Sequence, residues 1–84
     1  MQNSEKEILL SQIDKLHTTP MGIERIKTNL SLETDDVVKW CANEIQSEAS
    51  EVIRKGKNWY ISTASCTITV NAYSDTIITA HKKK

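Results

Sequence analysis

The sequence contains no phenylalanine, so its aromatic packing depends on four side chains: Trp40, Trp59, Tyr60 and Tyr73. It also lacks any apolar run approaching the roughly 20 residues that are needed to span a bilayer. The N-terminus does not combine a charged start with an apolar segment, as a signal peptide would. These absences predict a cytoplasmic protein that has no membrane partner.

Cysteine and histidine are scarce, with two of each. Cys41, Cys66, His17 and His81 lie far apart along the chain, which does not match the ligand spacing of a zinc site. We therefore expect no metal and no cofactor. Both cysteines fall at apolar positions of different predicted elements, which favours two buried thiols. A disulfide is the alternative, and it would require an oxidising compartment that nothing else in the sequence indicates.

The net charge is zero, but the two signs are separated along the chain. Residues 1–51 hold ten acidic and five basic side chains, whereas residues 52–84 hold six basic side chains and a single acid, Asp75. An anionic partner should therefore prefer the C-terminal part of the molecule.

Helical signals occupy the first half of the chain. A length of 84 residues with 38% apolar side chains indicates one folded domain over residues 1–84. Thr19 followed by Pro20 is typical of a helix start, since proline at the first helical position loses no hydrogen bond. Thr34 is expected to cap a third helix, with Asp35 and Asp36 near the positive end of its dipole.

Strand signals follow Ser50, where the apolar residues change from helical spacing to alternation. Short links separate four predicted strands, so antiparallel hairpins are expected: Val52–Arg54, Asn58–Ser62, Thr67–Tyr73 and Ile77–His81. The sequence thus predicts a two-layer α+β domain, in which three N-terminal helices pack on one face of a four-stranded antiparallel β-meander.

The register of this sheet determines which side chains share a face. A three-residue turn at Ser74–Thr76 separates polar from apolar side chains better than a two-residue turn does. It sets Val70 opposite Ala80 and Thr69 opposite His81. The predicted inner face then holds Trp59, Ile61, Ile68, Val70, Ala72, Ile78 and Ala80. The predicted open face holds Asn58, Tyr60, Thr69, Asn71, Tyr73, Thr79 and His81.

The open face provides the candidate catalytic residues. His81 is its only side chain that exchanges a proton near neutral pH, and Tyr60 and Thr79 lie on the same predicted face. A histidine beside hydroxyls and cations suits metal-independent cleavage of a phosphodiester, in which a base activates the ribose hydroxyl. The alternative interpretation is a solvated, threonine-rich face, because antiparallel sheets commonly leave one face wet.

The segment from Arg54 to Tyr60 interleaves cations with aromatics. Arg54, Lys55 and Lys57 are candidate phosphate-binding residues, and Tyr60 could stack on a base. The alternative is a charged hairpin tip whose Trp59 belongs to the core. The direction of Arg54 stays open: a two-residue turn aims it inward, whereas a three-residue turn aims it at the open face.

Several strings along the chain resemble an uncharacterised family of short bacterial proteins, a domain of unknown function. They include Arg54-Lys55-Gly56-Lys57-Asn58-Trp59-Tyr60 and Thr76-Ile77-Ile78-Thr79-Ala80-His81-Lys82. The order of helices followed by a four-stranded sheet is also similar to the barnase–EndoU–colicin–RelE-like ribonucleases. That second resemblance implies metal-independent RNA cleavage, with Arg54, Thr79 and His81 as site positions.

Two functional hypotheses follow. In the first, the open face binds RNA, a nucleotide or another phosphate-bearing ligand, and cleavage of RNA is its extended form. In the second, the domain is a non-catalytic interaction or regulatory module, such as a toxin–antitoxin partner or a phage-type inhibitor. An exposed edge strand could then pair with a protein partner or with a second copy of the chain.

Overall fold

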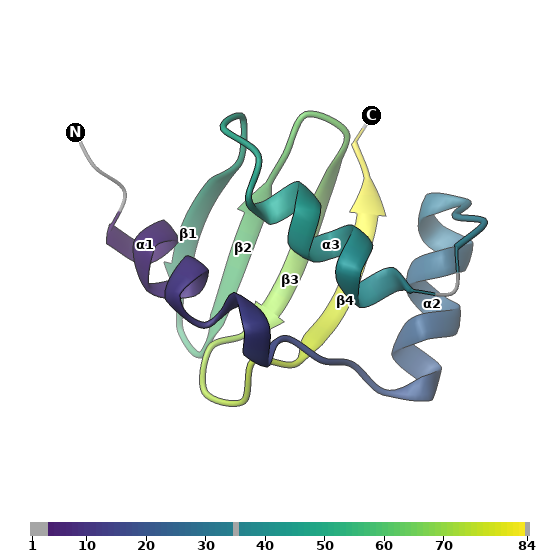
Figure 1. The fold of residues 1–84 in the computed structure, drawn as a ribbon, viewed down its shortest axis with the longest axis horizontal. Coiled ribbons are helices and arrows are strands. Elements are labelled where there is room, and N and C mark those ends of the chain that lie inside the picture. Colours follow the sequence, from purple (N-terminus) through teal and green to yellow (C-terminus); the bar gives the residue numbers. More distant parts are fainter. Residues whose placement is uncertain (1–3, 35, 84) are drawn as a thin grey trace.

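The structure is a computed structural model that describes residues 4–34 and 36–83. Helices precede strands along the chain, and all four strands join one antiparallel sheet in the order β1-β2-β3-β4 (Figure 1). The elements are α1 (Ser4–Ser11), the 3-10 helix η1 (Ile13–Lys15), α2 (Pro20–Leu30), α3 (Val37–Ile45), β1 (Glu51–Lys55), β2 (Asn58–Ser62), β3 (Cys66–Asn71) and β4 (Ile77–Lys82).

The helices form one layer against the sheet. In Figure 1, α1 and α3 lie in front of the strands, and α2 runs alongside β4 at the sheet edge. Contacts between α2 and β4 and between α1 and β1 join the layers at both edges. The predicted two-layer α+β fold is therefore confirmed.

The helix starts follow local capping chemistry. Thr19 Oγ1 accepts a hydrogen bond from the backbone N–H of Gly22 at 3.0 Å, and Pro20 takes the first helical position of α2, as predicted. The expected cap of α3 was wrong by two residues. Asp36, not Thr34, accepts the bond from the Lys39 N–H at 3.1 Å, because Asp36 stands directly before the first helical residue, Val37. Asp35 lies outside the described residues.

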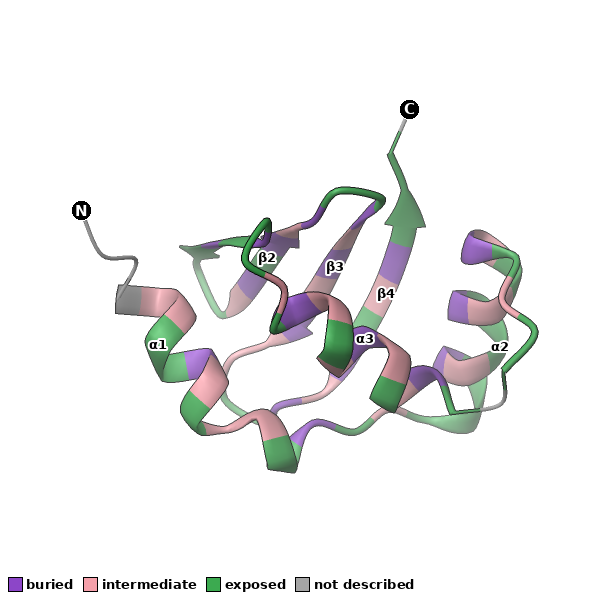
Figure 2. Ribbon diagram, turned by 45° about the horizontal axis from the view of Figure 1, so that its top comes forward, coloured by how far each residue is buried: buried purple, intermediate pink, exposed green. Residues whose placement is uncertain are grey.

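The core lies between the sheet and the helical layer (Figure 2). Trp59 is its largest side chain and is 1% exposed. Trp59 Nε1 donates a hydrogen bond to Glu5 Oε1 at 2.9 Å, which satisfies the indole as it is buried. The other buried hydrophobic residues are Leu9, Leu16, Ile26, Leu30, Val37, Cys41, Ile45, Val52, Ile61, Cys66, Ile68, Val70, Ile77 and Ala80.

The first two hairpins have a regular register. Gly56 and Lys57 form a two-residue turn, which sets Arg54 opposite Trp59 and Lys55 opposite Asn58. Gly56 has a φ of 62° and is the only one of the two turn residues at positive φ, as in a type II′ turn. Between β2 and β3, Ile61 pairs with Ile68 and Tyr60 with Thr69, as predicted.

The third hairpin differs from its predicted register. Ala80 pairs with Ile68, not Val70, so β4 is shifted by two residues along β3. A β-bulge follows, because Thr69 pairs with Thr79 whereas Val70 pairs with Ile77. The core residue of this segment is therefore Ile77, which is 1% exposed, and not the predicted Ile78, which is 37% exposed.

Contacts from distant residues explain the shift. The Ile77 N–H donates to the His17 carbonyl at 2.7 Å, and Thr18 Oγ1 donates to the Ile77 carbonyl at 2.8 Å. Both backbone groups of Ile77 are thus bound by the segment before α2. The β3–β4 loop is also longer than expected, since Asn71 Oδ1 accepts the N–H groups of Tyr73 and Ser74 and turns the chain early.

Candidate functional site

The open face of the sheet, opposite the helical layer, carries the candidate site. The shift by two residues preserves the faces of Thr79, Ala80 and His81, which lie beyond the bulge, so Tyr60, Thr69, Thr79 and His81 share this face despite the wrong register. The row across the four strands is Ile53, Tyr60, Thr69 and Thr79. His81 lies one row further on, opposite Thr67.

Tyr60 and His81 are consequently not adjacent. They lie on β2 and β4, two strand spacings apart, which is roughly 10 Å before the difference in row is added. Among the described residues no hydrogen bond joins the phenol to the imidazole, and the recorded partner of Tyr60 Oη is Asn58 Nδ2 at 3.5 Å. The sheet therefore brings Thr79 and His81 together on β4 and keeps Tyr60 apart from both.

His81 is exposed at the β4 edge, where α2 reaches it. Asn29 Nδ2 lies 3.5 Å from His81 Nδ1 and 3.4 Å from Thr79 Oγ1, and it donates to the Ala80 carbonyl at 3.1 Å. The amide thus satisfies a carbonyl at the outer edge of β4. Nothing in the sequence identified Asn29, because its partners lie about fifty residues further along the chain.

The three candidate phosphate-binding cations do not converge. Lys55 pairs with Asn58 on the open face, and Lys57 lies in the turn. Arg54 pairs with Trp59 and so belongs to the helix-covered side, which resolves its direction as inward. It remains exposed at the rim, where its Nε donates to the Gly56 carbonyl at 2.8 Å.

Tyr73 and Asn71 make loop contacts that the sequence did not predict. Tyr73 was expected on the open face, but it lies in the β3–β4 loop with 76% of its surface exposed. The Arg54 guanidinium carbon lies 5.3 Å from the centroid of its ring, which is cation–π geometry. The Asn71 Oδ1 is occupied within the loop, since it accepts hydrogen bonds from the Tyr73 and Ser74 N–H groups and from Ser74 Oγ.

A shallow hollow of about 590 Å³ lies over the β1–β2 hairpin on the open face. It is lined by Ile53, Lys55, Gly56 and Tyr60. Ile53 is 60% exposed, so an apolar side chain and a phenol ring stand together beside one ammonium group. Asn58 flanks the phenol, with Nδ2 at 3.5 Å from Tyr60 Oη.

A chain of hydroxyl groups around His17 was not foreseen. His17 Nε2 lies 3.0 Å from Thr76 Oγ1, and Thr76 Oγ1 lies 2.8 Å from Ser74 Oγ. Ser74 Oγ in turn donates to Asn71 Oδ1 at 3.2 Å. These contacts join the segment before α2 to the β3–β4 loop and hold that loop in shape. The sequence did not predict these contacts, because only the fold brings residue 76 to His17.

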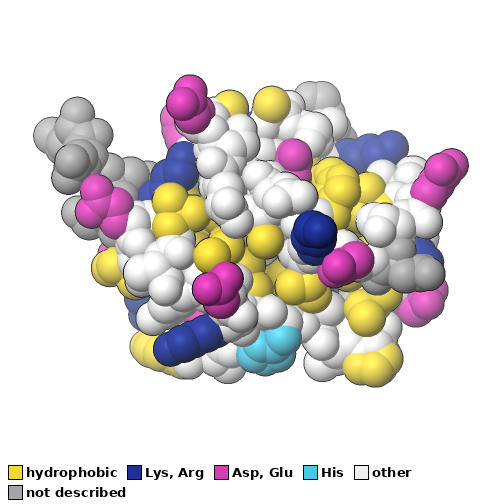
Figure 3. Space-filling model, in the orientation of Figure 1, with side chains coloured by type: hydrophobic (Ala, Val, Ile, Leu, Met, Phe, Trp, Pro, Cys, Tyr) yellow, Lys and Arg dark blue, Asp and Glu magenta, His cyan; other side chains and the backbone are white. Residues whose placement is uncertain are grey.

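The helical face has a different character. Figure 3 shows separate acidic side chains around a hydrophobic seam between the helices. Beneath it, Cys41 and Cys66 are buried free thiols, which confirms their predicted burial. Burial is the main cause that raises the pKa of the Cys41 thiol to about 12, followed by the nearby Cys66 and Glu44. Such a thiol is a poor nucleophile.

Within residues 4–34 and 36–83, no group of three or more histidine, cysteine, aspartate or glutamate side chains could hold a metal ion. None of the helices in this part of the chain has the length and hydrophobicity that a membrane crossing needs.

The comparisons with known proteins identify a family and no activity. The comparison with curated proteins and the comparison with solved structures each found no match. The model of a family described as "Protein of unknown function (DUF3781)" matches residues 10–81. That range covers most of the chain, which confirms the expected uncharacterised family and leaves the ribonuclease resemblance a prediction. The chain belongs to the DUF3781 family.

Proposed function

We propose that the open face of the sheet binds single-stranded RNA without cleaving it. The observation that carries this proposal is Tyr60, an exposed aromatic ring on the sheet face opposite the buried Trp59 and Ile61. Base stacking on such a ring accepts any sequence, because every base has a π-face. The nearby Lys55 and Lys57 provide positive charge for the phosphate backbone.

The charge distribution supports the same surface. The described acidic side chains come mostly from the helices and loops of residues 1–51, and Glu51 is the only acidic residue whose strand position faces the open side. Lys55 lies at the other end of β1, next to the hollow that contains Tyr60. An RNA strand across this hollow would meet the ring and the ammonium group together.

Cleavage has less support than binding. General acid–base catalysis needs its groups within hydrogen-bond reach of one substrate position. His81 and Tyr60 lie two strands apart, and the guanidinium of Arg54 belongs to the other side of the sheet. Catalysis by His81 with Thr79 stays a prediction. It is tested by incubating RNA with pure protein in EDTA, where cleavage that His81→Ala abolishes would support it.

Fluorescence anisotropy with a short labelled single-stranded RNA tests binding. Tyr60→Ala should weaken binding about tenfold or more, which is the usual effect of losing one stacking platform. Tyr73→Ala is the matched control, since Tyr73 is an exposed tyrosine that lies off the open face. Equal losses from both variants, or no binding by the unmodified protein at low salt, would contradict the proposal.

A salt series separates charge from stacking. Lys55→Gln should reduce the slope of log affinity against log salt by about one, because one phosphate contact is lost. Lys39→Gln, an exposed lysine of α3 on the helical face, should leave the slope unchanged. A change of the same size from Lys39→Gln would mean that binding follows overall charge, not this face.

The alternative function, a protein-interaction module, is favoured by one observation. Ile53 is 60% exposed beside Tyr60, and such a pair could pack against a partner or a second copy of the chain. Light scattering after size exclusion tests the second case. A stable oligomer that Ile53→Ser converts to a monomer would favour the interaction module over RNA binding.

A further inference from the structure

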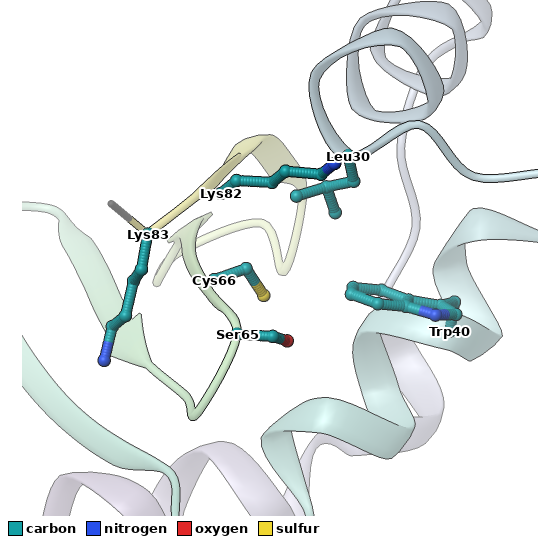
Figure 4. A pocket seen from close by; sticks show the side chains of 6 residues that line it. All are labelled: Leu30, Trp40, Ser65, Cys66, Lys82 and Lys83. Carbon is teal, nitrogen blue, oxygen red and sulfur yellow. The ribbon is translucent and has the colours of Figure 1, made fainter.

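A second concave site lies on the other side of the molecule, at the end of the sheet where β3 begins and β4 ends. It is a pocket of about 210 Å³ between the end of α2, the first half of α3 and these strand ends. Its lining residues are Leu30, Trp40, Ser65, Cys66, Lys82 and Lys83 (Figure 4). The proposed RNA face does not include any of them.

One wall of this pocket is apolar and firmly held. Leu30 is 6% exposed and Cys66 is fully buried, so both belong to the core. Figure 4 shows the indole of Trp40 facing Cys66 and Ser65 across the pocket. The Cys66 sulfur also lies 3.3 Å from Thr63 Oγ1, which fixes its position. A flat apolar group could therefore pack against the partly exposed Trp40 indole at the mouth of the pocket, while Leu30 and Cys66 stay in the core.

The opposite rim is cationic. Lys82 and Lys83 are both exposed, and neither forms an ion pair with any residue in the described ranges 4–34 and 36–83. Lys82 extends toward Leu30 in Figure 4, whereas Lys83 projects to the other side. The Lys83 N–H donates to the Ser65 carbonyl at 3.1 Å, which anchors this end of the chain to the pocket. Lys82 is therefore the cation nearer the apolar wall.

The negative groups near this rim have other partners. Glu44 Oε1 accepts hydrogen bonds from Ser65 Oγ at 3.0 Å and Thr63 Oγ1 at 3.3 Å, so this carboxylate holds the β2–β3 loop. The carbonyls at the end of α2 also favour a cation here, and the Ser31 and Leu32 N–H groups satisfy two of them. The Glu44 carboxylate keeps its charge, but among the described residues it forms no ion pair with Lys82 or Lys83.

We propose that this pocket binds a small aromatic carboxylate, with its ring against Trp40 and its carboxylate on Lys82. An apolar wall opposite a cation that has no ion pair among the described residues matches a ligand with one flat apolar end and one anionic end. The volume lies below the roughly 300 Å³ at which sites for drug-sized ligands begin, so the ligand has one or two rings. The Ser65 hydroxyl already donates its hydrogen to Glu44, so the lysines are the groups that would bind the carboxylate of the ligand.

An NMR titration of the full chain with benzoate and with 1-naphthoate tests this proposal. We expect saturable shifts of the Trp40 Nε1–H signal and of the Ser65 and Lys83 amide signals. Benzamide is the matched probe, because it keeps the ring and removes the charge, and it should bind at least severalfold more weakly. Absence of saturable shifts with both acids, or equal binding of benzamide, would overturn the proposal.

Single variants test which residues contact the carboxylate of the ligand and which contact its ring. Lys82→Gln should weaken binding of 1-naphthoate severalfold and more than Lys83→Gln does, because Lys82 lies nearer the apolar wall. Lys57→Gln, at the opposite end of the sheet, is the charge control and should have no effect. Trp40→Leu should remove the preference for 1-naphthoate over benzoate. Since the two lysines are exposed, their variants keep the test decisive even where Trp40→Leu fails to fold.

The same experiment distinguishes this site from the RNA face. Tyr60→Ala should leave binding of 1-naphthoate unchanged, and Lys82→Gln should leave the Tyr60-dependent part of RNA binding unchanged. If 1-naphthoate perturbs the NMR signals of Tyr60 and its neighbours and not those of Trp40 and Ser65, the assignment of the ligand to the pocket is overturned.

Discussion

The two outer hairpins of the sheet follow different rules. The β1–β2 hairpin turns in two residues and keeps a regular register along its whole length. The β3–β4 hairpin turns through residues 72–76, contains a β-bulge, and is held from outside by His17 and Thr18. Local turn chemistry therefore determines the first hairpin, whereas contacts from the N-terminal half determine the second.

The largest expected difference concerns the bulge. Ile77→Ala should lower the free energy of unfolding by about 2–5 kcal/mol, because it leaves a cavity in the core. Ile78→Ala should cost less than about 1 kcal/mol, since Ile78 is already partly exposed. Urea denaturation of both variants measures the difference. The register expected from the sequence requires the opposite order.

The turn of the regular hairpin should be the next most sensitive position. Gly56→Ala should cost roughly 1–2 kcal/mol, because a side chain at positive φ is strained even with open space around its Cβ. Lys57→Ala, at the other turn residue, should change stability by no more than about 0.5 kcal/mol. Similar losses from the two variants would show that backbone conformation is not what holds this hairpin.

A pH series examines how tightly α3 covers the start of the bulged hairpin. The pKa of Cys41 is raised from 9.0 to about 12 in the folded state. The contribution of the protonated Cys41 thiol to the free energy of unfolding is therefore fully present below pH 9. It is lost as the pH rises toward 12, by about 1 kcal/mol per pH unit in that window. Urea denaturation at several alkaline pH values should show a steeper loss for the unmodified protein than for Cys41→Ala. Parallel losses would mean that solvent reaches this thiol.

The outer edge of β4 offers a further contrast, because α2 covers it through a side-chain amide. Asn29→Ala should cost about 1 kcal/mol, since the hydrogen bond to the Ala80 carbonyl is lost. Thr28→Ala changes an exposed neighbour on the same helix and serves as the control. Amide exchange along β4 should also accelerate in the Asn29 variant and stay unchanged along β1; equal acceleration in both strands would contradict a local role.

The smallest effect is expected at Asp75, the positive-φ residue of the bulged hairpin. Its φ is 58°, and its buried Oδ1 has no hydrogen-bond partner among the described residues. Asp75→Gly should stabilise the protein by less than about 1 kcal/mol, because relief of strain is partly offset by the added freedom of glycine when unfolded. Thermal denaturation of Asp75→Gly, measured in parallel with Gly56→Ala, checks the sign of the change in stability. A clear loss would reveal a partner of the carboxylate.

Sequence reasoning succeeded where the determining contacts are local. Alternation and short links predicted the pairing of Ile61 with Ile68 and of Tyr60 with Thr69. It failed at Ile78 because the backbone partners of Ile77 lie about sixty residues earlier in the chain. It also failed at Tyr73, since the Asn71 side chain ends β3 early. Side-chain chemistry in a loop is not visible as periodicity.

The candidate site, like the fold, was predictable from the sequence only in part. Membership of the open face was predictable for Tyr60, Thr69, Thr79 and His81, because a shift of two residues leaves the face unchanged. Which of these side chains are neighbours was not predictable, since that depends on the register itself. The pocket beside Trp40 could not be foreseen either, because it combines four segments that only the fold brings together.

The bulge also affects how chains of this family can differ in length. Ile78 is the extra residue opposite Val70, so a chain that lacks it could pair β4 with β3 without interruption. Ala80 would still point to the core and His81 to the solvent. A one-residue gap at this position of an alignment would therefore mark a conservative change, whereas a gap two positions later would exchange the faces of every residue that follows.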